Sequence, residues 1–62
     1  MKAGDRIMCL KTFVCIMTDK QEFTVGKIYI VKQVIANTVY VELDDQGMTD
    51  NGWMVHNFQL VQ

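Results

Sequence analysis

Few side chains in this 62-residue chain could do chemistry: two cysteines, one histidine and several acids. Cys9 and Cys15 are six residues apart, so one extended strand would separate them by about 20 Å at ~3.3 Å per residue. A disulfide needs Cα atoms within about 7 Å, which would require residues 9–15 to form a tight hairpin. The sequence therefore predicts free, buried thiols in a reducing cytosol. With His56 they match no zinc-ligand spacing.

Asp44, Asp45 and Asp50 occupy one polar stretch where carboxylates could hold a cation, but their spacing is not that of an EF-hand loop. The sequence favours a solvated hairpin tip whose aspartates cap the turn. His56 has no nucleophile or second ligand near it, and we expect it on the surface of a helical turn. Three glycines are predicted to lie in turns and to form no phosphate loop: Gly26, Gly47 and Gly52. We therefore expect no enzyme, cofactor or metal site.

The composition suits one small domain spanning 1–62, because half of the residues are apolar. No apolar run reaches the ~20 residues that cross a bilayer, and "MKAGDRIMCL" has no signal-peptide core. We expect a cytoplasmic protein with no membrane contact. The net charge of -1 and the pI of about 5.6 argue against a basic face that grips phosphate.

Dense β-branched and aromatic residues without helical periodicity predict strands. Five short strands with tight connections indicate a small antiparallel barrel: 5–10, 27–35, 39–44, 53–55 and 59–61. A second apolar stretch, 12–17, follows a bend or bulge at Lys11-Thr12. The remaining segments are predicted as a loop at 18–22, a turn at Ala36-Asn37-Thr38 where Asn tolerates a left-handed conformation, a hairpin tip at 45–52 and one helical turn at 56–58.

Alternation along residues 39–44 places Val39, Val41 and Leu43 on one side. We expect a core formed by side chains from several strands of the barrel: Tyr29, Val31, Val41, Leu43, Phe58 and Leu60. Phe58 and Leu60 would complete it.

Two segments resemble Src-homology-3 (SH3) domains. In "FTVGKIYIV", Phe23, Gly26, Lys27, and the alternating Tyr29 and Val31 resemble the diverging turn and second strand. In "GWMVHNFQLV", the order of glycine, asparagine and aromatic resembles the Gly…Pro-Ser-Asn-Tyr closing segment. The resemblance implies a five-stranded antiparallel SH3-like barrel with a short helical turn before its last strand. A nucleic-acid-binding, KOW-like barrel that grips RNA is the alternative function that such a fold allows.

The pattern resembles still more closely the small SH3-like proteins of tailed phages and prophages. The matching positions are Gly4-Asp5, Cys9, Thr24, Gly26-Lys27, Tyr29, Val31, Asp44-Asp45, Gly47, Trp53, Phe58 and Val61. Most members of that group have no assigned activity. The resemblance therefore implies a fold and a setting inside a bacterial host, without a mechanism.

The chain departs from SH3 domains where they bind proline-rich peptides. Val39-Tyr40 open the third strand in place of a tryptophan, and Val55 stands where the closing proline would be. Phe58 replaces the closing tyrosine and has no hydroxyl. We therefore expect no proline-peptide binding.

The segment "TFVCIM" has more apolar side chains than one face of a small barrel can cover, because successive strand residues face opposite ways. Exposed contiguous apolar surface usually marks an interface. We predict a protein-interaction module, a phage accessory or host-modulating protein that binds a protein partner or a second copy. The partner-binding residues would be Phe13, Val14, Ile16, Met17, Trp53 and Met54. Two alternatives stay open: the segment plugs the barrel, and Trp53 is a structural anchor.

Overall fold

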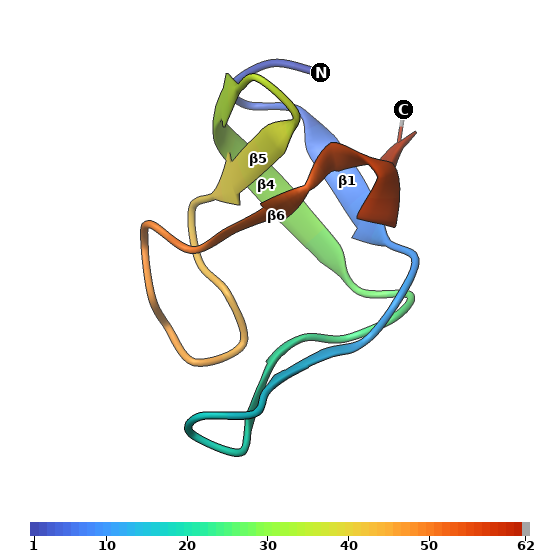
Figure 1. The fold of residues 1–62 in the computed structure, drawn as a ribbon. Helices are drawn as coiled ribbons and strands as arrows, with labels where there is room; N and C mark the ends of the chain where they lie inside the picture. The colour runs from blue at the N-terminus through green and yellow to red at the C-terminus, as the bar shows by residue number, and fades with distance from the viewer. Residues whose placement is uncertain (62) are drawn as a thin grey trace.

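Seven strands and one turn of 3-10 helix make up the computed structural model, which describes residues 1–61 (Figure 1). The strands are β1 (Arg6–Cys9), β2 (Phe13–Cys15), β3 (Lys20–Phe23), β4 (Ile28–Ile35), β5 (Thr38–Val41), β6 (Gly52–Met54) and β7 (Phe58–Val61), and the 3-10 turn η1 (Val55–Asn57) precedes β7. Five strands form an antiparallel sheet in the order β6-β5-β4-β1-β7. β2 and β3 form a second, two-stranded sheet. The expected all-β architecture with a helical turn before the last strand is confirmed.

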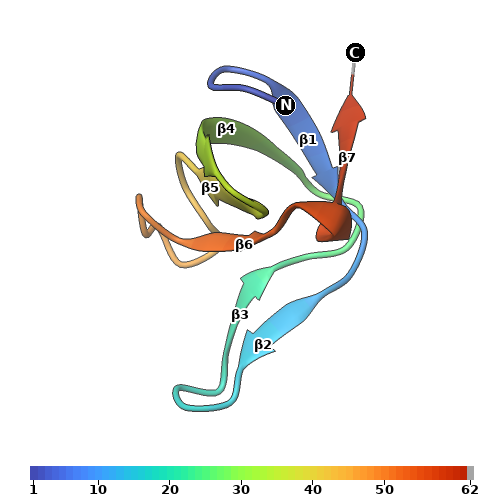
Figure 2. The same cartoon turned by 45° about the horizontal axis from the view of Figure 1, so that its top comes forward.

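The five-stranded sheet is curled but does not close into the expected barrel. Its edge strands are β6 and β7, and no pairing between them occurs within residues 1–61. Figure 2 shows the sheet bending from β6 at one edge round to β7 at the other. β6 has only three residues, and the chain passes from it directly into η1, which turns it toward the far edge where β7 pairs with β1. This turn takes the place of the backbone hydrogen bonds between β6 and β7 that would close a barrel.

The core lies on the inner face of this curl. Ile7 of β1 stands between Tyr29 of β4 and Leu60 of β7, while Cys9 pairs with Phe58. Alternation along each strand turns one set of side chains inward. The buried apolar residues are Ile7, Cys9, Phe23, Tyr29, Val31, Val39, Val41 and Phe58. The predicted core positions Tyr29, Val31, Val41 and Phe58 are therefore confirmed.

An irregularity in β4 lets residues in both of its halves contact this core. Val31 pairs with Val41 and Val34 with Val39, with a register shift between Val31 and Gln33. Three residues on β4 therefore advance as far as two on β5, which is the geometry of a β-bulge. The bulge lets Val31 and Val34 turn to the same side although they are an odd number of residues apart.

Leu43 and Leu60, which were predicted to be core residues, are exposed by 58% and 44%. β5 ends at Val41, so the inward-outward alternation does not continue to Leu43. Leu60 is the lateral neighbour of Ile7, but it lies on the edge strand β7 and no strand covers its other side. Both predictions were wrong because they extended a strand pattern beyond the covered part of the sheet.

Three local predictions also need correction. Residues 18–22, expected as a loop, contribute to β3, which pairs with β2. In the turn at 36–38 the positive φ of 53° belongs to Ala36, and Thr38 already begins β5. Gly52 lies in β6, opposite Tyr40. A Cβ there would come within 2.6 Å of the Tyr40 ring, so the absence of a side chain lets that ring cross the neighbouring strand.

Candidate functional site

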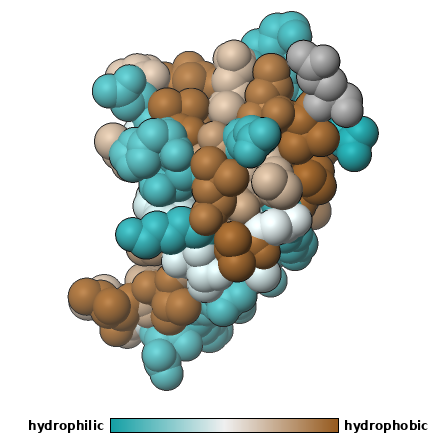
Figure 3. Space-filling view, turned by 90° about the vertical axis from the view of Figure 1, so that its right-hand side faces the viewer, coloured by the Kyte–Doolittle hydropathy of each residue, from teal (hydrophilic) through white to brown (hydrophobic). Residues whose placement is uncertain are grey.

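The β2–β3 hairpin, defined here as the arm (residues 13–23), projects away from the five-stranded sheet (Figures 1 and 2). Ile16 and Met17 lie in its turn and are 93% and 88% exposed. Val14, on β2, is 42% exposed. In Figure 3 apolar atoms gather at the lower end of the molecule, where the arm lies in Figure 1. The arm therefore does not fold back to fill an open end of the curled sheet.

The conformation of the arm follows from its pairing. Phe13 pairs with Phe23, Val14 with Gln21 and Cys15 with Lys20. The Asp19 N–H donates to the Cys15 carbonyl at 2.7 Å, closing the turn that presents Ile16 and Met17. Asp19 has a φ of 58°, a left-handed conformation that Asp tolerates better than most residues.

Aromatic side chains anchor the base of the arm to the sheet. The ring of Phe13 lies 5.0 Å from that of Trp53, and Phe23 stacks on Trp53 at 5.6 Å with an interplanar angle of 13°. The Phe23 ring also meets Phe58 edge to face at 5.4 Å. Such pairs contribute about 0.5–1.5 kcal/mol beyond area burial. Phe13 and Trp53 are half-buried and hold the arm, which supports the anchor interpretation of Trp53.

The six predicted partner-binding residues therefore fall into three groups. Val14, Ile16 and Met17 form the exposed surface of the arm, whereas Phe13 and Trp53 form its anchor. Met54 is exposed, but it pairs with Thr38 while its neighbour Trp53 pairs with the buried Val39. Because neighbouring strand residues face opposite ways, Met54 lies on the other face of the sheet from Trp53. The structure does not bring it to the arm.

A polar cluster fixes the β3–β4 turn to the loop between β5 and β6. The Asp45 carboxylate accepts hydrogen bonds from Lys27 Nζ at 2.7 Å, from the Tyr29 hydroxyl at 2.8 Å and from the Thr24 hydroxyl. The Tyr29 hydroxyl in turn accepts the Thr24 N–H at 2.8 Å. The cluster is a structural clamp, because every one of these polar groups already has a partner.

The pKa values in this clamp follow from the same contacts. Burial alone would raise the pKa of Asp45, but hydrogen bonds from Lys27, Thr24 and Tyr29 outweigh it and lower the pKa below 3.8. Burial, with the hydrogen bond to the neighbouring carboxylate, raises the pKa of Tyr29 to about 12. Asp45 therefore stays ionised and Tyr29 protonated near neutral pH, and neither is set for proton transfer.

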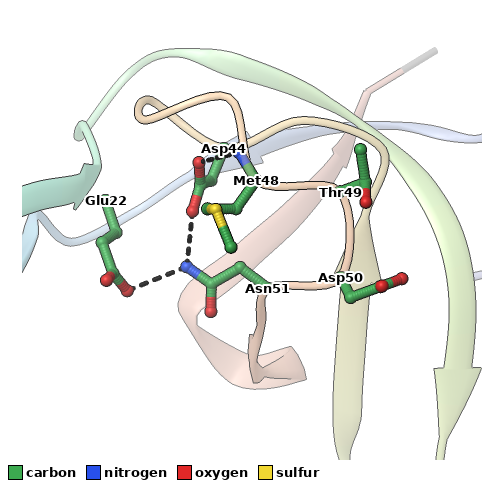
Figure 4. A pocket seen from close by; sticks show the side chains of 6 residues that line it. All are labelled: Glu22, Asp44, Met48, Thr49, Asp50 and Asn51. Carbon is green, nitrogen blue, oxygen red and sulfur yellow. Dashed lines mark hydrogen bonds between the residues drawn. The ribbon is translucent and has the colours of Figure 1, made fainter.

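An acidic pocket of about 270 Å³ lies where β3 meets the same loop (Figure 4). It is lined by Glu22, Asp44, Met48, Thr49, Asp50 and Asn51. Asn51 Nδ2 donates to Glu22 Oε1 and to Asp44 Oδ2, each at 2.8 Å, and Asp44 Oδ1 accepts the Gln46 and Met48 N–H groups at 2.8 and 2.9 Å. Asp44 thus caps the turn, as expected, but it is buried at 6% exposure and not solvated. In the described part of the chain, no three His, Cys, Asp or Glu side chains gather as a metal site would require.

The cysteines differ in environment. Both thiols are free, as predicted, but Cys9 is buried while Cys15 is half-buried. Burial raises the pKa of the Cys9 thiol. Hydrogen bonds from the Thr18 hydroxyl, the Thr18 N–H and the Met17 N–H lower the pKa of Cys15. His56 is exposed in η1, as expected.

Sequence reasoning missed β3 and the clamp on Asp45. The polar run "TDKQE" carries no strand pattern, and only its position after the apolar segment 12–17 and before the buried Phe23 could have suggested a hairpin. Asp44 and Asp45 are adjacent and identical in type. Nothing local distinguishes the turn cap from the clamp, because the partners of Asp45 lie 16 to 21 residues away.

Comparison of the chain with protein-family models, curated proteins and solved structures gives no match. Within residues 1–61, no helix is long and apolar enough to span a membrane.

Proposed function

We propose that this chain is a non-catalytic protein-interaction module that binds another protein through its arm. The single observation that carries the proposal is the exposure of Ile16 and Met17, 93% and 88%, at the end of a hairpin that projects from the sheet. Removing exposed apolar side chains from water on binding stabilises a complex by about 25 cal/mol per Å² of apolar surface, and contiguous exposed apolar surface marks interaction sites. Met17 also adapts its shape to a partner more easily than a branched side chain does.

The anchor of the arm supports this proposal. Aromatic residues are enriched at the centres of protein interfaces. Here Phe13, Phe23 and Trp53 instead pack on one another at the base of the arm, which leaves the aliphatic side chains of the turn to contact a partner. The aliphatic residues at the turn contribute nothing comparable to the core. An arm held firmly at its base and apolar at its end is a rigid binding element, which lowers the entropy cost of association.

The setting we propose is the cytoplasm of a bacterial host, with the chain acting as a small accessory or host-modulating protein of the phage SH3-like group. The five-stranded antiparallel sheet, the projecting first hairpin and the 3-10 turn before β7 support an SH3-like relationship. Because β6 and β7 do not pair with each other within residues 1–61, the relationship we propose is to an open variant of that fold.

Affinity capture tests this function. The immobilised chain is compared with Ile16→Ser/Met17→Ser after exposure to bacterial lysate, and retained proteins are quantified by mass spectrometry. The matched control is Ile35→Ser/Met48→Ser, which removes two side chains exposed by 55% and 61% outside the arm. We expect proteins retained by the parent and the control to be lost with the arm variant. Equal retention by all three would overturn the proposal.

A further inference from the structure

Within residues 1–61, the outer edge of β2 pairs with no other strand, since the second sheet consists of β2 and β3 alone. The Cys15 carbonyl accepts the Asp19 N–H inside the turn, and Cys15 pairs with Lys20 across the hairpin. The register of the hairpin shifts between Phe13 and Val14, so Val14 and Cys15 lie in one regular stretch of pairing. Because backbone polar groups alternate in direction along such a stretch, we place the N–H and C=O of Val14 on the side away from β3. In Figure 2 β2 forms the outer side of the arm.

The opposite edge of the arm is covered. The Glu22 carbonyl accepts the Asp45 N–H at 3.0 Å, and the Gln21 carbonyl accepts Gln46 Nε2 at 2.8 Å. The β3 strand also carries charged side chains, Lys20 and Glu22, which discourage pairing with another chain. Among the described residues no strand pairs with the outer β2 edge, and residues 12–18 hold no charge and no proline.

These observations lead us to infer that β2 pairs with β2 of a second copy, antiparallel and about a two-fold axis at Val14. The inference rests on the proposed function, since it uses the same arm, and it adds a second copy of this chain as a partner. Independent stability of a sheet needs three or more strands with a hydrophobic face, so a second pair of strands would add to the support that Phe13 and Phe23 already give the arm at its base. The pairing would join two arms into a four-stranded sheet.

The charges that flank the uncharged run favour a second copy in this orientation. Lys11 precedes it and Asp19 follows it. Antiparallel pairing at Val14 brings Lys11 of one copy toward the turn that holds Asp19 of the other, and the two-fold axis repeats this contact. Parallel pairing would set Lys11 beside Lys11. An isologous contact of this kind closes at two copies.

The size of the contact sets its strength. A standard interface covers about 800 Å² on each partner, which is about a fifth of the 4097 Å² surface of this chain. One short strand covers less than that. We therefore expect a weak dimer, with a dissociation constant of roughly 10 µM to 1 mM.

Sedimentation equilibrium over a concentration series tests the dimer. The apparent mass should rise from 7.2 kDa toward twice that value. Val14→Pro removes the outward N–H and should weaken dimerisation at least tenfold, whereas Val14→Thr keeps the N–H and the branched shape and should stay within about threefold. Circular dichroism and Trp53 fluorescence report whether the arm remains folded and docked. A parent that stays monomeric at 1 mM, or equal dimerisation of the two variants with folded arms, overturns the inference.

Cross-linking gives a second measurement if proline disrupts the arm. Paired Val14 residues would have Cα atoms about 5.5 Å apart, within disulfide range. Val14→Cys in a Cys15→Ser background should oxidise to a covalent dimer at least tenfold faster than Gln21→Cys in the same background. Equal rates overturn the inference. If the parent is monomeric but still captures proteins through Ile16 and Met17, the dimer is excluded and the proposed function stands. If the parent dimerises but captures no protein, the dimer stands and binding to a host protein is excluded.

Discussion

The arm and the inner face of the sheet have similar apolar residues but opposite environments. Phe58 and Val31 are covered from several sides, by neighbouring strands and by the aromatic base of the arm. Ile16 and Met17 belong to the same residue classes, yet almost their whole surface meets water. The difference lies in the number of covered faces and not in the side chains. The sheet thus buries its apolar residues in the core, whereas Ile16 and Met17 at the end of the arm stay exposed.

The largest expected effect is on the sheet side of this comparison. Phe58→Ala should lower the free energy of unfolding by about 3–5 kcal/mol, because it removes a buried ring that meets Phe23, Tyr29 and Trp53. Ile16→Ala should change it by less than about 0.5 kcal/mol. Urea denaturation followed by Trp53 fluorescence measures both. Similar losses for the two variants would show that the arm is as much a part of the core as Phe58.

The clamp that joins the loop to the sheet should give the next largest effect. Asp45→Asn should cost about 1–3 kcal/mol, because it weakens charge-assisted hydrogen bonds from Lys27, Thr24 and Tyr29. Asp50→Asn is the control, since its ion pair with Lys32 is largely exposed and should contribute at most about 1 kcal/mol. Chemical denaturation of both variants against the parent measures the difference.

The clamp also has a pH signature. The pKa of Asp45 is lower in the folded protein than its ordinary value of 3.8, so the folded state favours the carboxylate. Its stabilisation should be complete above that value and lost as the pH falls through the folded pKa. The stability difference between the parent and Asp45→Asn should therefore shrink as the pH drops below about 4. A constant difference between pH 7 and pH 2.5 would contradict the clamp.

Gly52→Ala should have a smaller effect, about 1 kcal/mol of destabilisation. The new Cβ would lie 2.6 Å from the Tyr40 ring and 3.0 Å from the Thr38 methyl group, and the ring must move. In a Tyr40→Ala background the same change should be nearly neutral. A double-mutant cycle by thermal denaturation tests this, and an equal cost in both backgrounds would mean that the ring does not restrict position 52.

The smallest perturbation is chemical modification of the thiols. In the folded protein at pH 7.5, Cys15 should react with a thiol reagent at least tenfold faster than Cys9. The Cys15 pKa is lowered by hydrogen bonds from Thr18 and Met17, while burial raises that of Cys9. Both should react, without prior reduction, once the chain is unfolded. Mass spectrometry of each cysteine-containing peptide against time distinguishes them, and faster labelling of Cys9 would contradict the packing of β1.

The strands that could be predicted from sequence are those whose pattern is local. β4 and the start of β5 show apolar alternation, and the structure places them within one residue of the predicted starts. The helical turn at η1 is displaced by one residue from the expected 56–58. Strand β3 could not be found this way, because its polar residues pair along an exposed hairpin where only Phe23 is buried. A strand can be predicted from sequence when one of its faces is buried, because such burial imposes an alternation of apolar and polar residues.

The candidate site was predictable only in part. Excess apolar residues at 12–17 indicated an exposed surface, and the structure exposes Val14, Ile16 and Met17. Sequence could not separate the anchor from the surface, because Phe13 and Val14 are both apolar residues typical of strands and the direction in which the strand turns each side chain decides which is covered. The sequence also could not show whether the sheet closes into a barrel. That depended on whether β6 and β7 would meet, and a three-residue strand followed by a turn left no length for pairing.

The position of β1 between β4 and β7 has a consequence for the order of folding. Ile7 pairs with Leu60, 53 positions along the chain (60 − 7), whereas Val34 pairs with Val39 only five positions away (39 − 34). Loop-closure entropy grows as about (3/2)RT ln n, so the first contact costs about 2 kcal/mol more than the second. The β4–β5 hairpin should therefore form early and β7 dock last. Because Phe58 arrives with β7, aromatic packing at the base of the arm is completed only in that final step.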